Sequence, residues 1–146
     1  MNLIFFDPEN RDELLPLAAT RPVADIRIGI STIREKWLQQ LGVTASSTDT
    51  AGYLAPQFPL VSKNDNLWIN GSVCPTPELA ASVKSLKAGE MIFAGVICVA
   101  ICHLKKEKDK LTRIDSKEMP TVISRPFDIF KNNGTEIQRD FERLGI

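Results

Sequence analysis

Residues 2–27, NLIFFDPENRDELLPLAATRPVADIR, decide the fold that the rest of the chain completes. The apolar run Leu3 to Phe6 predicts a β-strand, and it lacks the polar alternation of a strand with one wet face. We therefore expect this strand to lie inside a parallel sheet that is covered on both faces. The polar segment that begins at Asp7-Pro8 then forms a loop at the carboxyl edge, where open α/β sheets bind ligands. Residues 7–27 are accordingly the first place to look for a functional site.

The composition limits the classes of protein to consider. The 146 residues suffice for one domain, and the 43% apolar content suffices for a core. Lysine plus arginine and aspartate plus glutamate both number 18, which argues against a nucleic-acid binder. Three cysteines without disulfide spacing indicate reduced thiols in a cytoplasmic protein. The longest apolar stretch, residues 91–102, is shorter than the about 20 residues that span a membrane.

Three helices are expected. The first covers residues 29–42, with Thr32 and Glu35 as a capping box and Gly42 at its end. The second begins at Thr76-Pro77 and ends before Gly89. The third follows Thr135 as N-cap, and its apolar face consists of Ile137, Phe141 and Leu144.

Further strands are expected between and after these helices, at residues 43–47, 67–69, 91–103 and 121–123. In the long strand over 91–103, Gly95 marks a bulge or a bend. A charged turn over 105–110 then leads to residues 111–114, which return as an antiparallel partner. The order of elements predicts an α/β three-layer domain with a mainly parallel sheet and a late antiparallel hairpin.

The opening stretch resembles the start of the sugar-1-phosphate nucleotidyltransferases, which have a strand, a glycine-rich loop ending in Gly-Thr-Arg, then Pro-Leu-Thr and Lys-Pro. Arg11 matches the loop arginine, Pro16-Leu17 the Pro-Leu, and Arg21-Pro22 the Lys-Pro. The segment LWINGSVCPTPEL, residues 67–79, is similar to the Gly-Asp strand end of the family, with Gly71-Ser72 in the Gly-Asp position. The resemblance implies a Rossmann-like nucleotidyltransferase fold.

A narrower resemblance is to the N-terminal region of divergent bifunctional uridylyltransferase/acetyltransferases for N-acetylglucosamine. It rests on the same segment and on LLPLAATRPVADIRIGISTIREKW (14–37) and RPFDIFKNNGTEIQRDF (125–141). In that group a β-helix acyltransferase domain follows. We therefore expect residues 1–146 to form a single domain that is the N-terminal part of a longer protein. If the final helix normally packs against another domain, exposed Phe141 and Leu144 would favour a homo-oligomer.

The resemblance also implies a reaction and a set of site residues. The substrates would be a nucleoside triphosphate and a sugar 1-phosphate, with UMP as the transferred group and Mg²⁺ as cofactor if the domain is active. Arg11 and Arg21 would hold phosphates, and Asn70, Gly71 and Ser72 would line the nucleotide site.

The residues themselves supply little of what nucleotidyl transfer needs. The loop Asp7-Pro8-Glu9-Asn10 has no glycine, and its carboxylates would repel a triphosphate. Ser72 stands where the family has a magnesium-binding aspartate, and a hydroxyl is a poor substitute for a carboxylate on Mg²⁺. We therefore predict no protein-derived metal ligand.

Several of these residues have a structural interpretation beside the functional one. Arg11 is either a phosphate contact or a loop arginine paired with Asp7 or Asp12. For Arg21 an ion pair with Asp25 is favoured, and for Asp7 the acceptance of loop amides is favoured over metal binding. For Asn70 and Ser72 a turn role is favoured over ligand contact. Arg27 and Lys36 are predicted to be surface charges. Asp128 is predicted to be a loop or cap residue, and Asp140 a surface residue of the final helix.

A zinc site at Cys98, Cys102 and His103 is rejected, because positions 98 and 102 of one strand lie roughly 13 Å apart. Two hypotheses remain. The first is a Mg²⁺-dependent sugar-1-phosphate nucleotidyltransferase. The second is a non-catalytic domain of the same fold that binds a nucleotide or sugar, or that positions an acyltransferase partner.

Overall fold

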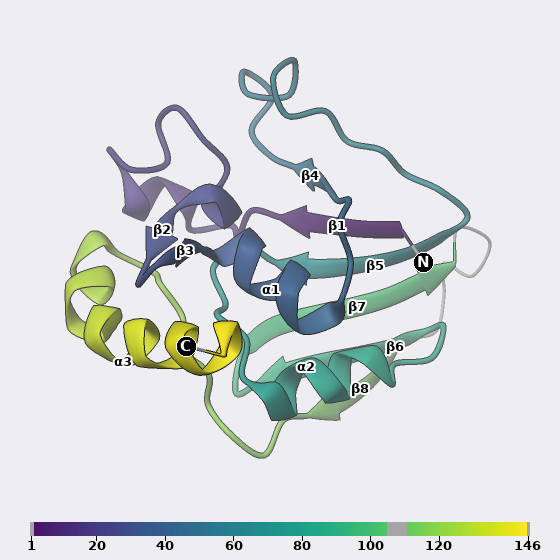
Figure 1. Cartoon of the computed structure of the whole chain (residues 1–146). Coiled ribbons are helices and arrows are strands. Elements are labelled where there is room, and N and C mark those ends of the chain that lie inside the picture. The colour runs from purple at the N-terminus through teal and green to yellow at the C-terminus, as the bar shows by residue number, and fades with distance from the viewer. Residues whose placement is uncertain (1, 105–110, 146) are drawn as a thin grey trace.

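A six-stranded sheet forms the centre of the molecule, in the order β4-β1-β5-β7-β6-β8 (Figure 1). The computed structural model describes residues 2–104 and 111–145. The strands of this sheet, in sheet order, are Ser47–Asp49, Asn2–Phe6, Asp65–Asn70, Ile97–Leu104, Glu90–Ala94 and Thr112–Asp115. A second sheet pairs β2, Arg27–Ile28, with β3, Ser31–Thr32. The helices are the 3₁₀ turns η1, Arg11–Leu14, and η2, Val23–Asp25, and the α-helices α1, Ile33–Leu41, α2, Pro77–Lys84, and α3, Pro126–Leu144.

The sheet is mainly parallel. Strand β1 pairs in parallel with β4 and β5, and β6 pairs in parallel with β8. Strand β7 runs antiparallel to both of its neighbours, β5 and β6. The predicted mixed α/β class, with a mainly parallel sheet and a late antiparallel hairpin, is confirmed.

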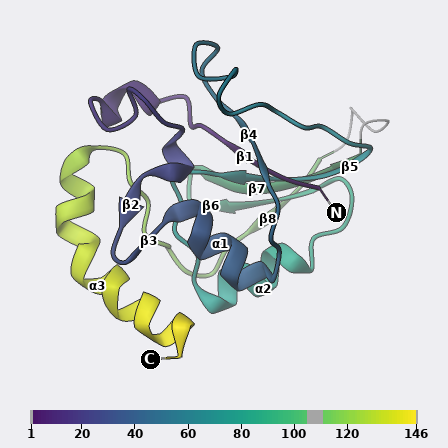
Figure 2. The same ribbon diagram turned by 45° about the horizontal axis from the view of Figure 1, so that its top comes forward.

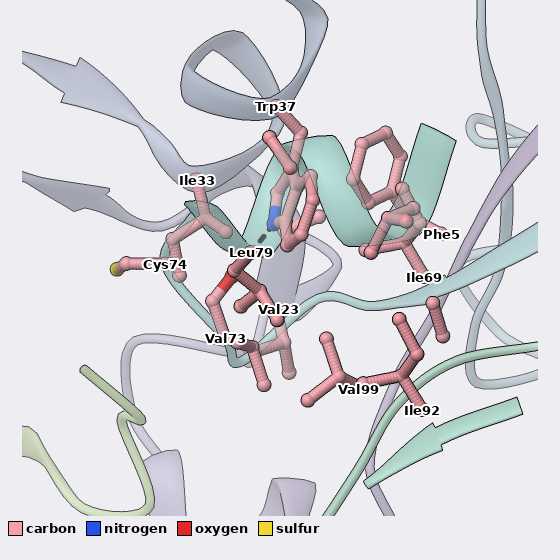
Figure 3. Packing of buried hydrophobic residues seen from close by; sticks show 14 of the residues in the cluster. Phe5, Val23, Ile33, Trp37, Ile69, Val73, Cys74, Leu79, Ile92 and Val99 are labelled. Atoms are coloured by element: carbon pink, nitrogen blue, oxygen red, sulfur yellow. Dashed lines mark hydrogen bonds between the residues drawn. The ribbon is translucent and has the colours of Figure 1, made fainter. Parts of the chain in front are cut away.

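Strand β1 is buried on both faces, as its unbroken apolar run predicts. Leu3, Ile4 and Phe5 are at most 3% exposed. Phe5 packs in the core with Ile33 and Trp37 of α1 (Figure 3). The indole N–H of Trp37 is satisfied by the carbonyl oxygen of Val73 at 2.7 Å, so this large side chain is buried without an unpaired donor.

The two faces of the sheet are covered by different kinds of structure. Helices α1 and α2 lie on one side, whereas the segment between β4 and β5 crosses the other (Figure 2). The side chain of Asn2 donates to the carbonyl oxygen of Val61, and Asn66 accepts from the backbone N–H of Lys63. These bonds hold the segment over β1 and β5, so the second layer at this edge is a loop.

The caps predicted for the first two helices are confirmed, although α1 begins at Ile33 and not at the predicted residue 29. The Thr32 hydroxyl accepts from the Glu35 N–H at 3.1 Å, and Gly42 ends α1 in the left-handed conformation. The Thr76 hydroxyl accepts from the Leu79 N–H at 3.1 Å, with a proline at the first helical position of α2. Helix α2 ends at Lys84, before the predicted stop at Gly89.

The prediction of one strand over residues 91–103 is wrong. The chain turns at Gly95, whose φ of +63° suits a two-residue hairpin, and β6 and β7 pair with each other. Strand β8 is correspondingly a parallel partner of β6, not an antiparallel return of the long strand. The predicted turn over 105–110 lies outside the described residues.

Smaller corrections concern the flanking segments. The strand predicted over 43–47 forms at Ser47–Asp49. The strand predicted over 121–123 is reduced to a single bridge between Val73 and Val122. Helix α3 begins at Pro126, so Thr135 lies inside it and is not its N-cap. Asp128 caps this helix, as expected, by accepting from the N–H groups of Ser124 and Arg125.

A buried polar cluster joins α3 to α1 and to the β2–β3 turn. Asp140, 1% exposed, accepts from Lys36 Nζ at 2.5 Å and from the Ile30 N–H at 2.8 Å. Lys36 is fully buried and lies 4.0 Å from the carboxylate of buried Glu136. The prediction that Lys36 and Asp140 lie on the surface is therefore wrong, because each supplies the charge that allows the other to be buried.

Candidate functional site

The carboxyl ends of β1 and β5 meet at one edge of the sheet. Phe6 and Asn70 are register partners, and the Gly71 N–H donates to the carbonyl oxygen of Phe6 at 2.9 Å. The loop that follows β1 and the turn that follows β5 therefore lie side by side, as the opening stretch predicts. This is the edge at which parallel α/β sheets bind ligands.

Gly71 has a packing role at this edge. A Cβ atom at Gly71 would lie 2.9 Å from the backbone nitrogen of Ala24 and 3.1 Å from its side chain. A residue with a side chain would push η2 away from the strand end. Gly71 therefore fixes how closely the loop over residues 22–25 approaches the sheet.

A cleft of about 500 Å³ opens at the same edge. Glu9 is the charged side chain among its described lining residues. The neutral polar groups are those of Asn10, Asn70, Ser72 and Ser124, and the apolar walls are Phe6, Pro8, Phe93, Val96, Ile97 and Val122, with Cys98 beside them. The cleft thus offers hydrogen bonds and apolar contact, but its lining includes no cation.

Asn70 and Ser72 line the cleft and also stabilise the turn. The Asn70 side chain donates to the carbonyl oxygen of Cys98 at 3.0 Å and accepts from the N–H and hydroxyl of Ser72. These bonds tie the end of β5 to the start of β7. Among the described residues, one amide hydrogen of Asn70 and the lone pairs of the Ser72 hydroxyl have no hydrogen-bond partner, and the two residues are 5% and 3% exposed.

Arg11 points away from the cleft, into the loop that follows β1. Its guanidinium bonds to Asp7 at 2.8 Å, to the carbonyl oxygens of Ala18 and Arg21, and to the hydroxyl of Tyr53. Burial by itself lowers the pKa of Arg11, but the hydrogen bond with Tyr53 and the charge of Asp7 outweigh it, and the pKa is raised. In this arrangement Arg11 holds the loop over residues 7–21 together and ties it to Tyr53.

Asp7 completes this network. Its carboxylate accepts from the Val23 N–H at 2.9 Å, from the Thr50 hydroxyl and from Arg11. The prediction that Asp7 satisfies loop groups is confirmed, and so is its pairing with Arg11.

Arg21 lies elsewhere. Its side chain lines a separate, mostly apolar groove of about 420 Å³ together with Arg27 and Phe130. The predicted ion pair between Arg21 and Asp25 is wrong, because Asp25 pairs with Arg34 at 2.7 Å. The structure therefore places Asn70 and Ser72 in the lining of the cleft, packs Gly71 against Ala24, and places the charged ends of Arg11 and Arg21 away from the cleft.

The donor set of the cleft does not fit Mg²⁺. This ion prefers several hard, charged oxygen ligands in octahedral geometry. The cleft supplies one carboxylate, Glu9, and the amide oxygen of Asn70 is already engaged by Ser72. Among the described residues, no group of three or more histidine, cysteine, aspartate or glutamate side chains is placed to hold a metal.

One wall of the cleft was missed by sequence reasoning. Phe93, Val96, Ile97 and Cys98 come from the β6–β7 hairpin, which the sequence presented as one continuous strand. The available signal was Gly95, a glycine inside a β-branched run. Cys98 is half-buried, and burial raises the pKa of its thiol.

A family model described as sugar nucleotidyl transferase matches residues 3–145. The chain belongs to the sugar nucleotidyl transferase family. The match covers both strand ends that form the cleft and the whole of α3. A search of curated proteins found no match. None of the helices in the described part of this family member is long and apolar enough to cross a membrane.

Proposed function

We propose that the cleft at the ends of β1 and β5 binds the uncharged part of a nucleotide sugar. On this proposal the chain is a ligand-binding domain of the sugar nucleotidyl transferase family. The observation that carries the proposal is the lining of the cleft, in which neutral hydrogen-bonding groups alternate with apolar walls and the charged residue is acidic.

The charge of the cleft determines whether it binds the rings of a nucleotide sugar or its phosphates. A base or sugar ring needs hydrogen-bond partners and apolar contact, which Asn70, Ser72 and Phe93 supply. A phosphate needs cations or free N–H groups. At about 4 Å from Glu9, one negative charge would be repelled by about 1 kcal/mol in water and by more near the protein surface. The cleft therefore favours the ring over the phosphates.

A second candidate is full sugar-1-phosphate nucleotidyltransferase activity, favoured by the family match over nearly the whole chain. A phosphate oxygen of the sugar 1-phosphate would attack the α-phosphorus of the nucleoside triphosphate, and pyrophosphate would leave. Arg11 and Arg21 would hold phosphates only after Arg11 released Asp7 and its carbonyl partners. The lining of the cleft argues against this candidate, because the triphosphate charge has no partner there.

The identity of the ligand is a finer proposal. The resemblance of residues 14–37, 67–79 and 125–141 to the bifunctional uridylyltransferase/acetyltransferases supports uridine as the base and N-acetylglucosamine as the sugar. It also supports attachment to an acyltransferase domain, and the three free cysteines suit a cytoplasmic protein. The ligand and the acyltransferase domain rest on the resemblance, and the cytoplasmic assignment rests on the cysteines.

Isothermal titration with uridine, UDP-N-acetylglucosamine and UTP, each with and without Mg²⁺, separates the two candidates. We expect uridine and the UDP-sugar to bind with similar affinity, UTP to bind more weakly, and Mg²⁺ to change little. Tighter binding of UTP with Mg²⁺, together with pyrophosphate release from UTP and N-acetylglucosamine 1-phosphate, would instead establish the transferase. Absence of heat with all three ligands would reject the binding proposal.

Cys98 provides a second readout of the same cleft. It is half-buried in the cleft wall, whereas Cys74 and Cys102 are at most 1% exposed. A small thiol reagent at alkaline pH should therefore modify Cys98 first, and a bound ligand should slow that reaction. Cys98→Ser is the control, because it should remove the fast phase.

A further inference from the structure

Helix α3 presents its apolar side to solvent. Its two fully buried side chains, Glu136 and Asp140, are charged. Phe127 and Phe130 are 69% and 81% exposed, and Phe141 and Leu144 are 43% and 44% exposed. A helix of a globular domain normally buries its apolar side and exposes its charges, so α3 is reversed in this respect.

The reversal follows from how α3 is anchored. Its inner side docks through polar bonds: Asn133 accepts from the Gly29 N–H, Asp140 accepts from Lys36, and Arg143 donates to the carbonyl oxygen of Pro75. These bonds fix the rotation of the helix about its axis. The exposed apolar residues are therefore held on the outer flank of α3, a helix that lies at the edge of the molecule (Figures 1 and 2).

The apolar flank has the spacing of a helix–helix seam. We call residues 127, 130, 134, 137, 141 and 144 the α3 stripe, and they follow one another at intervals of 3, 4, 3, 4 and 3. This is the a/d spacing of a coiled coil, in which each position meets a facing helix. The spacing points to a helix, and not to a loop or a small ligand, as the element that covers the stripe.

The α3 stripe of one copy can also pair with the α3 stripe of a second copy that runs in the opposite direction. In an antiparallel pair of α3 helices, Phe127 faces Leu144, Phe130 faces Phe141, and Gly134 faces Ile137. Gly134 has open space around its Cα, so the two backbones can approach at the centre of the pair. A two-fold interface requires a patch that matches itself in this way.

We propose that two copies of this chain associate through antiparallel pairing of their α3 stripes. The exposed fractions of Phe127, Phe130, Phe141 and Leu144 correspond to about 400 Å² of side-chain surface per copy. The adjoining groove, which Leu17 and Ile26 line beside Phe130, continues this apolar surface. The total approaches the lower end of specific interfaces, about 1,000 Å², which is the size class of weak, transient complexes.

Analytical ultracentrifugation of the whole chain over a wide concentration range tests the proposal. We expect a monomer–dimer equilibrium for the wild type and a monomer for Phe130→Glu at every concentration. The control is Met119→Glu, which places the same charge at an apolar residue that is 63% exposed outside α3 and should leave the equilibrium unchanged. Helical circular dichroism of each variant confirms that it is folded.

Mixing two variants tests the orientation. Phe130→Glu and Phe141→Lys should each be monomeric alone. Mixed, they should form a heterodimer, because the antiparallel register sets Glu against Lys at one pair and leaves Phe against Phe at the other. A wild type that stays monomeric, or a Phe130→Glu variant that still dimerises, would overturn the proposal, and a mixture that stays monomeric would overturn the antiparallel register.

Discussion

Asp140→Asn should destabilise the fold severely although it changes a single atom type. The carboxylate accepts from Lys36, Arg143 and the N–H groups of Ile30 and Ser31. An asparagine oxygen in the place of Oδ2 can still accept from Lys36 and the two backbone N–H groups, but the amide hydrogens then face Arg143, and the side chain no longer carries a charge to balance either cation. Within residues 2–104 and 111–145, the carboxylate left to pair with the buried Lys36 would be that of Glu136, at 4.0 Å, and Arg143 would lose its ion-pair partner.

The magnitude follows from this loss of charge. Removing one partner of a buried ion pair costs about 3–5 kcal/mol, because the remaining charge stays desolvated and uncompensated. Domains of this size are stable by about 5–15 kcal/mol in total. The variant should therefore lose a large part of its stability, and the loss should begin at α3.

Urea denaturation at pH 7, followed by circular dichroism and by tryptophan fluorescence, measures the free energy of unfolding. Asp128→Asn is the matched control, because it makes the same substitution in the same helix at a capping carboxylate. That control should cost less than about 1 kcal/mol, because asparagine caps a helix nearly as well as aspartate. If Asp140→Asn costs no more than Asp128→Asn, the polar cluster does not anchor α3 and the reasoning is refuted.

Three further predictions follow from the same contacts. Burial by itself raises the pKa of Asp140, but the hydrogen bonds from Lys36 and the Ile30 N–H outweigh it and lower the pKa. The stability that this carboxylate contributes should therefore be complete above about pH 4, the ordinary aspartate value, and should be lost as the pH falls further. The destabilisation caused by Asp140→Asn should accordingly become smaller in acid. Gly29→Ala should cost more than Gly42→Ala in urea denaturation: both glycines have positive φ, but a Cβ at Gly29 would lie 2.8 Å from Asp140 Oδ2, whereas one at Gly42 meets nothing within 4 Å. Equal costs for the two would contradict close packing of α3 on the β2–β3 turn. Glu9→Lys should strengthen UTP binding by about tenfold at low salt, because it replaces a repulsion of roughly 1 kcal/mol or more by an attraction. Uridine carries no charge, so its binding should not change. An equal gain for uridine would rule out the electrostatic explanation.

The sequence by itself determined the elements that depend on local chemistry. The unbroken apolar run of β1, the hydroxyl caps at Thr32 and Thr76, and the stop at Gly42 were all read correctly. The meeting of Phe6 with Gly71 was also predictable, because parallel strands present their carboxyl ends at one edge. The choice of Asn70, Gly71 and Ser72 as site residues came from the family resemblance, and of these the structure places Asn70 and Ser72 in the lining of the cleft.

The hairpin was not determined locally. Residues 91–103 suit one long strand as well as two short ones, because strand propensity is satisfied in both. The choice was made by pairing: β7 fills the position between β5 and β6, and each strand then gains a partner. The wall of the cleft that contains Phe93 and Cys98 therefore appeared only with the tertiary structure.

The charged residues depended most on the tertiary structure. Lys36 and Asp140 are 104 positions apart, and neither has a local feature that predicts burial. Arg11 could serve a phosphate or a loop; its pairing with Asp7, four positions away, could be foreseen, whereas its contact with Tyr53, 42 positions away, appeared only in the fold. Apolar burial can be read from spacing along the chain because it needs no specific partner, whereas a charge is buried only where a distant opposite charge meets it, and that meeting exists only in the folded molecule.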